Sequence, residues 1–599
     1  MPNIPHDPAA AYSERLAARK AARDAFDARF DRIANLRLAV FLLAALMAGL
    51  AFWGSMHPAW LLLPIAGFVA LAVRHESVAR GRARADAAVG YYEKGLRRIA
   101  GDWPGDGVQD VAAQERDHPY APDLDLFGPA SLFELLCQAQ TASGRTRLAG
   151  WMQRPQAAAD IRARQEAVRE LAPRLDLRED LARLGLDVRG AVRGSTLARW
   201  SVRPAELTGG WAPRGYLALT VATVLALLVF IQWNIGFPFL ILFTIQLLLL
   251  GTTAKRAVRV LMAVEEPERE LRVLIHLLDR LGAEQFEAPV LRSIRERLTE
   301  DGKDAAARIR QLERLVYLFN LQMNQLFFPV SLLLMWSVHF AFAIESWRLR
   351  WGRHLPDWLA AVGEFEALLS LAAFAWEHPD YPYPEIVEGE PLLEGKALRH
   401  PLLKPGVCVP NGVTLGGAHR ITIVSGSNMS GKSTYLRVVG INVVLAQLGA
   451  PVAAGSMRLT PFQIGATLRV QDSIQSGVSR FYAELQRLKA VSDLISRDIP
   501  VLFLLDEILH GTNSHDRQVG AEALVRSFVE RGAIGFVTTH DLALTKAADA
   551  MGEAAANVHF SDHLEGSELI FDYTMRPGVV EHSNALQLMA NLGLLPEAK

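Results

Sequence analysis

The sequence of 599 residues is poor in cysteine and carries almost no net charge. Its two cysteines, Cys137 and Cys408, are far apart, which excludes a disulfide framework and a cysteine-based metal site. The formal net charge of −1 excludes a polycationic chain, so a contact with nucleic acid would require a local basic patch. This cysteine usage fits a reducing, cytoplasmic environment for the polar parts of the protein.

Apolar residues, in contrast, are abundant. They make up 50% of the chain, and the mean hydropathy of +0.14 is high for a sequence with 21% charged residues. The longest apolar runs form two close pairs, at about 38–56 with 58–75 and at about 215–233 with 236–254. Since a membrane helix needs about 20 mostly apolar residues, each pair predicts a transmembrane hairpin. Two buried helical hairpins in a soluble core are the alternative.

The charges around these runs predict their orientation. The loops inside the pairs, GSMHPAW and QWNIGFP, contain no Lys, Arg, Asp or Glu, whereas the outer flanks are basic. This is the positive-inside pattern of a multi-pass protein of the inner (cytoplasmic) membrane, with its N-terminus and large domains in the cytoplasm. The flanking basic residues are Arg29, Arg32, Arg37, Arg74, Arg80, Arg82, Arg84, Arg199, Arg203, Arg214, Lys255, Arg256 and Arg259.

A fifth apolar run, 326–344, is long enough to span a membrane but has basic residues on both sides. A single crossing would also move the C-terminal domain out of the cytoplasm. We therefore expect a buried or membrane-surface helix here. The charged stretch before the first run is too long for a cleavable signal peptide. Residues 12–36 have helical spacing and mixed charge, so we expect a solvated helix there.

Composition shifts divide the chain into five parts. We predict an N-terminal helix with the first hairpin over 1–100, a linker rich in Gly, Pro and Asp over 101–129, and a helical core with the second hairpin over 130–376. A Pro-rich linker over 377–389 precedes a domain over 390–599, in which β-branched runs alternate with helices. This alternation is typical of an α/β sheet.

The segment RITIVSGSNMSGKST has the order of a phosphate-binding loop: a β-branched strand, Gly426-x4-Gly431-Lys432-Ser433, and a helix. Backbone N–H groups of such a loop surround phosphates, and Lys432 would reach the β- and γ-phosphates of ATP. The Ser433 hydroxyl would bind Mg²⁺. The expected nucleotide-binding residues are Gly426, Ser427, Asn428, Met429, Ser430, Gly431, Lys432, Ser433 and Thr434.

Two further strands end in polar residues. VLFLLDE reads as a buried strand followed by Asp506, which would complete the Mg²⁺ site, and by Glu507, which would polarise the attacking water. AIGFVTTHD reads as a strand ending at His540, which could sense the γ-phosphate. These residues predict an ATPase of the P-loop class.

Taken in order, these motifs resemble the ATPase domain of the MutS family, whose domain belongs to the ABC-type P-loop ATPases. The matching segments are GSNMSGKST, LLDEILHGTNSHD, TTHD and the signature-like DSIQSGVSRFYAEL. The resemblance implies a homodimer in which two chains enclose two ATP molecules, with Ser479 reaching the partner's nucleotide. Upstream, residues 123–155 and 364–375 are similar to the start and end of the family's helical core, and the resemblance makes DNA a possible partner.

The sequence departs from the family in three places. DNA-repairing members insert the aromatic ring of a Phe-x-Glu motif into the base stack, but here the first hundred residues contain a membrane hairpin instead. The DNA clamp is not identifiable. Cys408 and Val409 stand near the position where the family often has an aromatic residue that stacks on adenine. Mismatch recognition is therefore not implied.

Three functions remain open. The first is a membrane-anchored, DNA-associated MutS homologue whose cytoplasmic arginines contact phosphates without reading bases. The second is a membrane ATPase switch that acts on a protein or membrane partner without DNA. The third, a transporter, is the weakest, because the central parts of the four apolar runs contain no Lys, Arg, Asp, Glu or His that could line a substrate path. The candidate arginines are Arg292, Arg295, Arg297, Arg308, Arg310 and Arg314.

Overall fold

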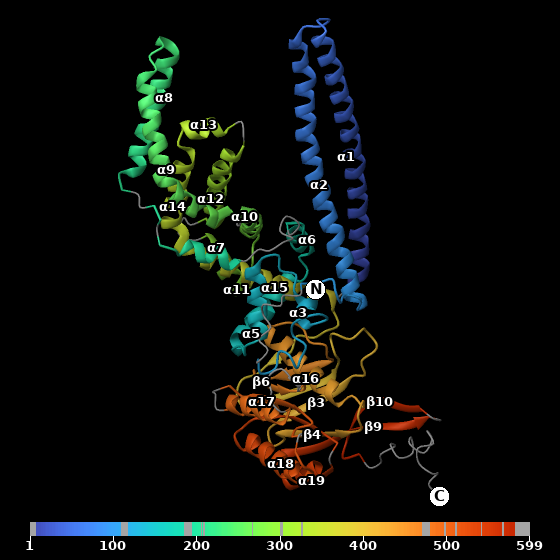
Figure 1. The fold of residues 1–599 in the computed structure, drawn as a ribbon. Coiled ribbons are helices and arrows are strands. Elements are labelled where there is room, and N and C mark those ends of the chain that lie inside the picture. Colours follow the sequence, from blue (N-terminus) through green and yellow to red (C-terminus); the bar gives the residue numbers. More distant parts are fainter. Residues whose placement is uncertain are drawn as a thin grey trace.

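The computed structural model has an α/β domain at one end, a helical core in the middle and two helical hairpins that rise from the opposite side of the core (Figure 1). The tips of both hairpins point the same way, away from the α/β domain. The residues described are 7–108, 118–184, 194–204, 206–207, 210–265, 268–299, 304–324, 327–469, 480–495, 499–509, 512–540, 542–565 and 568–580.

The first hairpin consists of α1 (Pro8–Phe52) and α2 (Leu62–Ala100). Asp7 caps α1 by accepting a hydrogen bond from the Ala9 N–H at 2.9 Å, and Gly101 ends α2 in the left-handed conformation. Two glycines of α2 let α1 approach closely, because a Cβ on Gly81 would lie 2.6 Å from Phe26 and one on Gly95 would lie 2.4 Å from Tyr12. The two helices therefore pack on each other along the stem.

The second hairpin consists of α8 (Ala212–Trp233) and α9 (Phe237–Glu265), joined at Asn234 in the left-handed conformation. Polar side chains link it to the rest of the chain. Gln246 donates to the Leu333 carbonyl at 3.1 Å, and the Thr220 hydroxyl lies 3.1 Å from His339 Nε2. This hairpin therefore has neighbouring protein on one side, unlike the upper part of the first.

Large apolar side chains are exposed on both hairpins, for example Leu63 at 73% and Leu248 at 67%. By length and hydropathy, helices at Pro8–Phe52, Ala59–Ala100 and Ala212–Trp233 could cross a membrane, and the most apolar windows of these helices are at most 17% buried. Phe237–Thr253 is a shorter apolar helix. Contiguous exposed apolar surface of this size marks sites of contact with other proteins or with a membrane.

The fifth apolar run does not form one helix. It forms α13 (Phe328–Leu333) and the start of α14 (Trp336–Trp351), which are separated at Met335 with a φ of 47°. Ala341 and Ile344 are completely buried. The continuous helical segment Trp336–Glu377 passes the length and hydropathy criteria for a span, but its apolar window is 83% buried. The second half of the run is thus part of the protein core.

The helical core surrounds α15 (Leu355–Glu377), whose side chains are buried along most of its length. Its neighbours include α4, α5 and α11, and the apolar cluster that they share continues into the α/β domain. The other core helices are α3 (Leu132–Leu136), α4 (Ala142–Met152), α5 (Ala158–Leu171), α6 (Leu175–Leu184), α7 (Gly194–Ser201), α10 (Glu268–Ala283), α11 (Pro289–Thr299) and α12 (Ala305–Asn320).

The α/β domain contains a six-stranded sheet in the order β10-β9-β4-β8-β7-β6, parallel except for the β9–β10 pair. A four-stranded sheet in the order β1-β5-β2-β3 lies at its start. The strands are β1 (Glu385–Ile386), β2 (Leu392–Leu398), β3 (Asn411–Gly416), β4 (Ile421–Gly426), β5 (Ser456–Leu459), β6 (Gln463–Thr467), β7 (Val501–Asp506), β8 (Ile534–Thr539), β9 (Ala555–Glu565) and β10 (Glu568–Pro577). The helices are α16 (Lys432–Leu448), α17 (Arg480–Leu494), α18 (Ser514–Glu530) and α19 (Leu542–Ala550).

Part of the segment expected to be a linker is buried against the α/β domain. Asp123 is 0% exposed and accepts hydrogen bonds from the Leu468 N–H at 2.7 Å and the Arg469 N–H at 2.8 Å. It is also paired with Arg487 of α17. Burial raises the pKa of Asp123, and these donors oppose that shift. The segment, which was expected to be a linker between the first hairpin and the helical core, therefore also packs against the α/β domain.

Candidate nucleotide site

Three strand ends meet at one edge of the six-stranded sheet. Ser425 of β4 pairs with Thr539 of β8, and Asp506 of β7 pairs with Thr538. Since β4, β8 and β7 are parallel neighbours, their carboxyl ends lie at the same edge, where α/β sheets bind ligands. This topology brings the glycine loop, the Asp506-Glu507 pair and His540 together, although they are distant in the sequence.

The glycine loop has the backbone of a phosphate cradle. Gly426 has a φ of 150° and Gly431 a φ of 101°. A Cβ at Gly426 would lie 2.8 Å from the Phe560 carbonyl oxygen and 2.9 Å from Ser430 Oγ, so a side chain would collide there. Met429 also has a positive φ, of 70°, and its side chain is 84% exposed. The loop ends at α16, whose first N–H groups point towards the cradle.

Lys432 lies inside this loop. Its ammonium donates to the Gly426 carbonyl at 2.9 Å and to the Ser427 carbonyl at 2.8 Å, and lies 3.8 Å from Glu507 Oε1. Burial lowers the pKa of Lys432, while Glu507 and Asp506 oppose the shift. The ammonium is thus held by the loop and directed at the sheet edge where the acidic pair lies.

Asp506 and Glu507 are fixed by Thr538 of the neighbouring strand. The Thr538 hydroxyl donates to Asp506 Oδ1 and accepts a hydrogen bond from the Glu507 N–H at 3.1 Å. Glu507 has a φ of 48°, a strained conformation for a residue with a side chain. This turn directs the Glu507 carboxylate towards Lys432, and strain of this kind is often found at functional sites.

His540 follows β8 and lies beside Glu507. Its Nδ1 is 3.3 Å from Glu507 Oε1, the same oxygen that faces Lys432, and its side chain is 42% exposed. Glu507, Thr539 and His540 also line a small cavity that reaches Arg517 of α18. The sequence-predicted catalytic pair is therefore in direct contact, with the histidine accessible from the surface.

The remaining predicted loop residues have unequal environments. Ser430 is buried, and its hydroxyl has no hydrogen-bond partner among the described residues. Ser433 is half-buried, whereas Asn428 and Thr434 are exposed. Ser479 lies outside the described residues.

Three residues of the site were not predicted from the sequence. Thr538 lies in the quoted TTHD motif, and counting back from His540 along the strand could have identified it. Asp562 of β9 accepts a hydrogen bond from the Ser427 hydroxyl at 3.1 Å. Tyr573 of β10 packs its ring on the glycine loop, 3.0 Å from the position of a Cβ on Gly431. No sequence motif indicated the last two, which come from a hairpin far along the chain.

Cys408 stands near the position where the family often has an aromatic residue that stacks on adenine. Its Sγ accepts a hydrogen bond from the His400 N–H at 3.3 Å, and the side chain is half-buried. Tyr573, in contrast, is 44% exposed beside the glycine loop. Of these residues, only Tyr573 offers an aromatic surface at the cradle.

The side chains fit Mg²⁺ and a nucleotide triphosphate. Three kinds of group can donate to phosphate oxygens. They are the N–H groups of the glycine loop, where a Cβ at Gly426 would collide, the buried Lys432 ammonium, and the Ser430 hydroxyl, which has no partner among the described residues. Mg²⁺ needs only one or two protein oxygens, because phosphates and waters complete its octahedron. Ser433 and Asp506 would provide them. The described residues contain no cluster of three or more His, Cys, Asp or Glu that would hold a metal ion by itself.

Comparison with known proteins gives one family match. Residues 422–598 match the family model MutS domain V. The chain is 32% identical to the DNA mismatch repair protein MutS of Shouchella clausii over 241 residues, which is 39% of this chain and 27% of the relative. It is 34% identical to the Endonuclease MutS2 of Thermomicrobium roseum over 216 residues, 35% of this chain and 26% of that protein.

The chain thus spans about a quarter of the length of these curated relatives. The matched region contains the glycine loop, β7 with its acidic pair, β8 and the β9–β10 hairpin. The C-terminal region of this chain is therefore similar to domain V of the MutS family, a P-loop ATPase domain, and it follows a helical N-terminal region.

Proposed function

We propose that this protein is a membrane-anchored ATPase of the MutS type. The observation that carries the proposal is the meeting of Lys432 and His540 at one carboxylate oxygen of Glu507, at the carboxyl edge of a parallel sheet. Burial and three strand ends fix this group before any nucleotide binds. Such preorganisation is what phosphoryl transfer requires of a protein, since most of its catalysis is positioning and charge stabilisation.

Each residue has a distinct role in the proposed hydrolysis. Lys432 and the loop N–H groups would bind the phosphate oxygens, and Ser433 with Asp506 would hold Mg²⁺, which would neutralise the phosphate charge. Glu507 orients the attacking water and accepts its proton. His540 positions the Glu507 carboxylate by direct contact at 3.3 Å. Thr538 keeps Asp506 and Glu507 in their different directions.

The site is proposed to need a second copy of the chain. The relatives' signature segment corresponds to residues 472–485, and Ser479 would contact the nucleotide of the partner. Two copies would then enclose two ATP molecules. The accessible side of His540 and the exposed Met429 leave the mouth of the cradle open for such a partner.

Membrane anchoring is the second part of the proposal. It is supported by the exposed apolar surface of both hairpins, by their uncharged tips and by their common direction in Figure 1. The basic flanks favour an inner-membrane protein with its N-terminus, core and ATPase domain in the cytoplasm. Both hairpins would then enter the same bilayer, with the ATPase domain at the far end of the molecule.

DNA is the proposed ligand of the ATP cycle because the relatives are named DNA mismatch repair proteins. One observation favours the alternative, an ATP-driven switch acting on a protein or membrane partner. Of the candidate phosphate-contacting arginines, Arg297 is paired with Glu364 at 2.6 Å and Arg310 with Asp279 at 2.6 Å. Arg308 lies over the Trp351 ring. Arginines held in this way are less available for a DNA backbone.

The test uses the detergent-solubilised full chain. ATP hydrolysis is measured for the native protein, Lys432→Ala and Glu507→Gln, with Lys489→Ala as a control for an exposed lysine paired with Asp493. We expect turnover to fall by about 10²-fold or more in the first two variants and to stay unchanged in the control. Glu507→Gln should still bind ATP. If Lys432→Ala hydrolyses ATP at the rate of the native protein, the proposed site is refuted.

Binding to homoduplex and mismatched DNA, at several salt concentrations and with or without ATP, separates the two functions. Salt-sensitive binding that ATP modulates would support the DNA-associated protein. Intact ATPase activity without DNA binding at low salt would leave the membrane switch. A preference for mismatched over homoduplex DNA would support a role in mismatch repair.

A further inference from the structure

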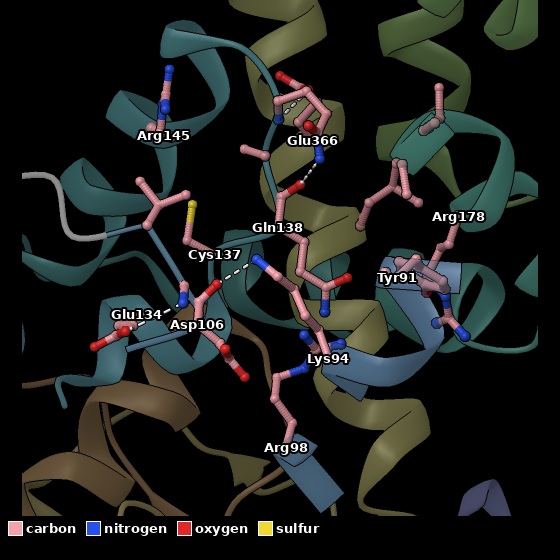
Figure 2. Close-up of a pocket in the computed structure, with 18 of the residues that line it drawn as sticks. Tyr91, Lys94, Arg98, Asp106, Glu134, Cys137, Gln138, Arg145, Arg178 and Glu366 are labelled. Atoms are coloured by element: carbon pink, nitrogen blue, oxygen red, sulfur yellow. Dashed lines mark hydrogen bonds between the residues drawn. The ribbon is translucent and has the colours of Figure 1, made fainter. Parts of the chain in front are cut away.

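A second cavity lies far from the nucleotide site, where the first hairpin joins the core. It has a volume of about 330 Å³ and is enclosed by the base of α2, the turn after α3, and the helices α6 and α15 (Figure 2). Four cationic side chains line it: Lys94, Arg98, Arg145 and Arg178. Because these come from separate elements, a molecule bound here would contact both the hairpin and the core.

The carboxylates of the cavity are already occupied. Glu134 accepts hydrogen bonds from the N–H groups of Gly105 at 2.8 Å and Ala130 at 2.7 Å. Glu366 accepts from the Gln140 N–H at 2.9 Å and from the Thr141 hydroxyl. These bonds fold the surrounding turns, and the third carboxylate, Asp106, is paired with Arg97 outside the cavity. None of the three carboxylates therefore has its full capacity left to neutralise the cations.

Two of the cations are also occupied. Arg98 forms a two-pronged pair with Glu377, at 2.5 and 2.8 Å. The Lys94 ammonium donates to the Asp106 carbonyl at 2.5 Å, as Figure 2 shows. Arg145 offsets part of the charge of Glu366, so the remaining capacity of the cavity depends on Arg178.

Arg178 is 4% exposed, and only one side of its guanidinium is used. Nη1 donates to the Ala372 carbonyl at 2.9 Å, which fixes the plane of the group, and the Trp376 ring lies 5.6 Å away. Nε and Nη2 have no hydrogen-bond partner among the described residues. These two N–H groups point the same way and form the fork that matches two oxygens of a carboxylate or phosphate.

Two further buried donors in the cavity lack a partner within the described part of the chain: the Tyr91 hydroxyl and Arg145 Nε. A buried polar group without a partner costs about 1–3 kcal/mol, and more if it is charged. Native proteins avoid this cost, so a fixed and empty fork beside further donors indicates a missing acceptor. The Arg178 fork and the Tyr91 hydroxyl lie on the same side of the cavity in Figure 2 and could both donate to one anion, whereas Arg145 lies on the opposite side.

The distance from the apolar region decides the source of that anion. Val73 lies near the end of the apolar run of α2. Tyr91 lies about 27 Å from Val73 along the axis of the same helix. A lipid headgroup at a bilayer surrounding the apolar run could not reach this depth. The ligand must therefore come from the aqueous phase.

We propose that this cavity binds a small water-soluble oxyanion, a phosphate or carboxylate group held by the Arg178 fork with help from Tyr91. The bound anion joins α2 of the hairpin to α6 and the core, so its binding stiffens their junction. The proposal does not depend on the identity of the nucleotide reaction at the other end of the molecule.

The test measures equilibrium binding of radiolabelled inorganic phosphate and, separately, of radiolabelled succinate to the full chain in detergent. A non-hydrolysable ATP analogue with Mg²⁺ is kept at saturation to block the glycine loop. The variants are Arg178→Lys, which keeps the charge but loses the fork, and Tyr91→Phe, which loses only the hydroxyl. Arg169→Lys is the control, because Arg169 is stacked on Tyr383 outside the cavity.

We expect at least one probe to bind, with about tenfold lower affinity in Arg178→Lys, a smaller loss in Tyr91→Phe and no change in the control. Binding of phosphate alone would identify a phosphate ester as the ligand class, and binding of succinate alone a carboxylate. The proposal is overturned if neither probe binds the native chain at millimolar concentration. It is also overturned if Arg178→Lys, with an unchanged melting temperature, binds as tightly as the native chain.

Discussion

Both hairpins rest on a buried arginine–glutamate pair, but the two pairs connect different parts of the chain. At the first hairpin, Arg98 belongs to the hairpin helix α2 and Glu377 to the core helix α15. At the second, Arg348 and Glu345 both belong to the core helix α14. The first pair therefore crosses the junction between hairpin and core, and the second pair lies on one side of it.

The second pair reaches its hairpin through the backbone. Arg348 donates to the carbonyls of Trp200, Arg203 and Pro204, and Glu345 accepts from the Glu206 N–H at 2.8 Å. These groups precede α8 and hold the chain that leads into it. The comparison shows that the same ion pair can dock a hairpin directly or can fix the segment that positions it.

The largest effect is expected from Glu377→Ala. The side chain is 1% exposed and accepts bonds from Arg98 and from the Tyr12 hydroxyl at 3.2 Å, so its loss leaves a buried charge without compensation. We expect a loss of about 4 kcal/mol in unfolding free energy, measured by denaturant titration in detergent, and a wider distribution of spin-label distances between α1 and the core.

The control is Glu93→Ala, which removes the partner of Lys20 in a pair that is about two-fifths exposed. Such surface pairs contribute less than about 1 kcal/mol. Equal losses in Glu377→Ala and Glu93→Ala would contradict the view that the buried pair docks the hairpin.

Glu345→Ala is expected to cost slightly less, about 3 kcal/mol by the same titration. Arg348 keeps its carbonyl acceptors in this variant, which limits the penalty of the unpaired charge. Because both members lie on α14, the spin-label distances of the first hairpin should not change. A change at the first hairpin would show that the two junctions are coupled.

The α/β domain contains a buried histidine, His400. Burial lowers the pKa of His400 to about 4, and Arg437 adds to the shift. A folded pKa below the unfolded value of about 6.5 gives stability that is complete above pH 6.5 and is lost as the pH falls towards 4. We expect a loss of about 2–3 kcal/mol over this range in denaturant titrations of the domain.

His400→Gln should make this pH dependence shallower, whereas His515→Gln, at an exposed position on α18, should leave it unchanged. A native pH profile that is the same in His400→Gln would show that other groups cause the acid sensitivity.

The smallest effect is expected at the contact between the second hairpin and the core helix α14. Thr220→Val removes the contact between the Thr220 hydroxyl and His339 at 3.1 Å. Hydrogen bonds between membrane helices average about 0.6 kcal/mol, and we expect that loss in unfolding titrations in mixed micelles. Thr244→Val is the matched control, because the Thr244 hydroxyl bonds only to its own helix, at Leu240. A loss above about 2 kcal/mol would show that this contact is a main attachment of the hairpin.

The comparison also explains which parts of the molecule could be predicted from the sequence. The glycine loop, the acidic pair and the apolar runs are local patterns, since loop chemistry and hydropathy depend on neighbouring residues. The pairing of Arg98 with Glu377 joins residues 279 positions apart, and no periodicity indicates it. The hydrogen bonds of Asp123 with Leu468 and Arg469 also join distant residues, and the sequence did not predict them. The Gly and Pro residues near Asp123 suggested a linker instead.

The fifth apolar run shows a different limit. Hydropathy gives one continuous stretch, but Met335 adopts the left-handed conformation and separates α13 from α14. Trp336 donates to the Leu318 carbonyl of α12 at 2.7 Å, and tertiary contacts of this kind outweigh local helix preference. Similarly, Thr538 of β8 bonds to Asp506 and Glu507 at the end of β7. Only the register of these two strands reveals that contact.

The length of α1 has a consequence for assembly. The helix begins at Pro8 and its apolar run begins near residue 38, so a polar stem of about 45 Å separates the proposed bilayer from the core. This is several Debye lengths, and the negative potential of anionic lipids does not extend that far. The stem would therefore confine two ATPase domains to one plane beyond the surface charge, where tethering raises their effective concentration and favours pairing.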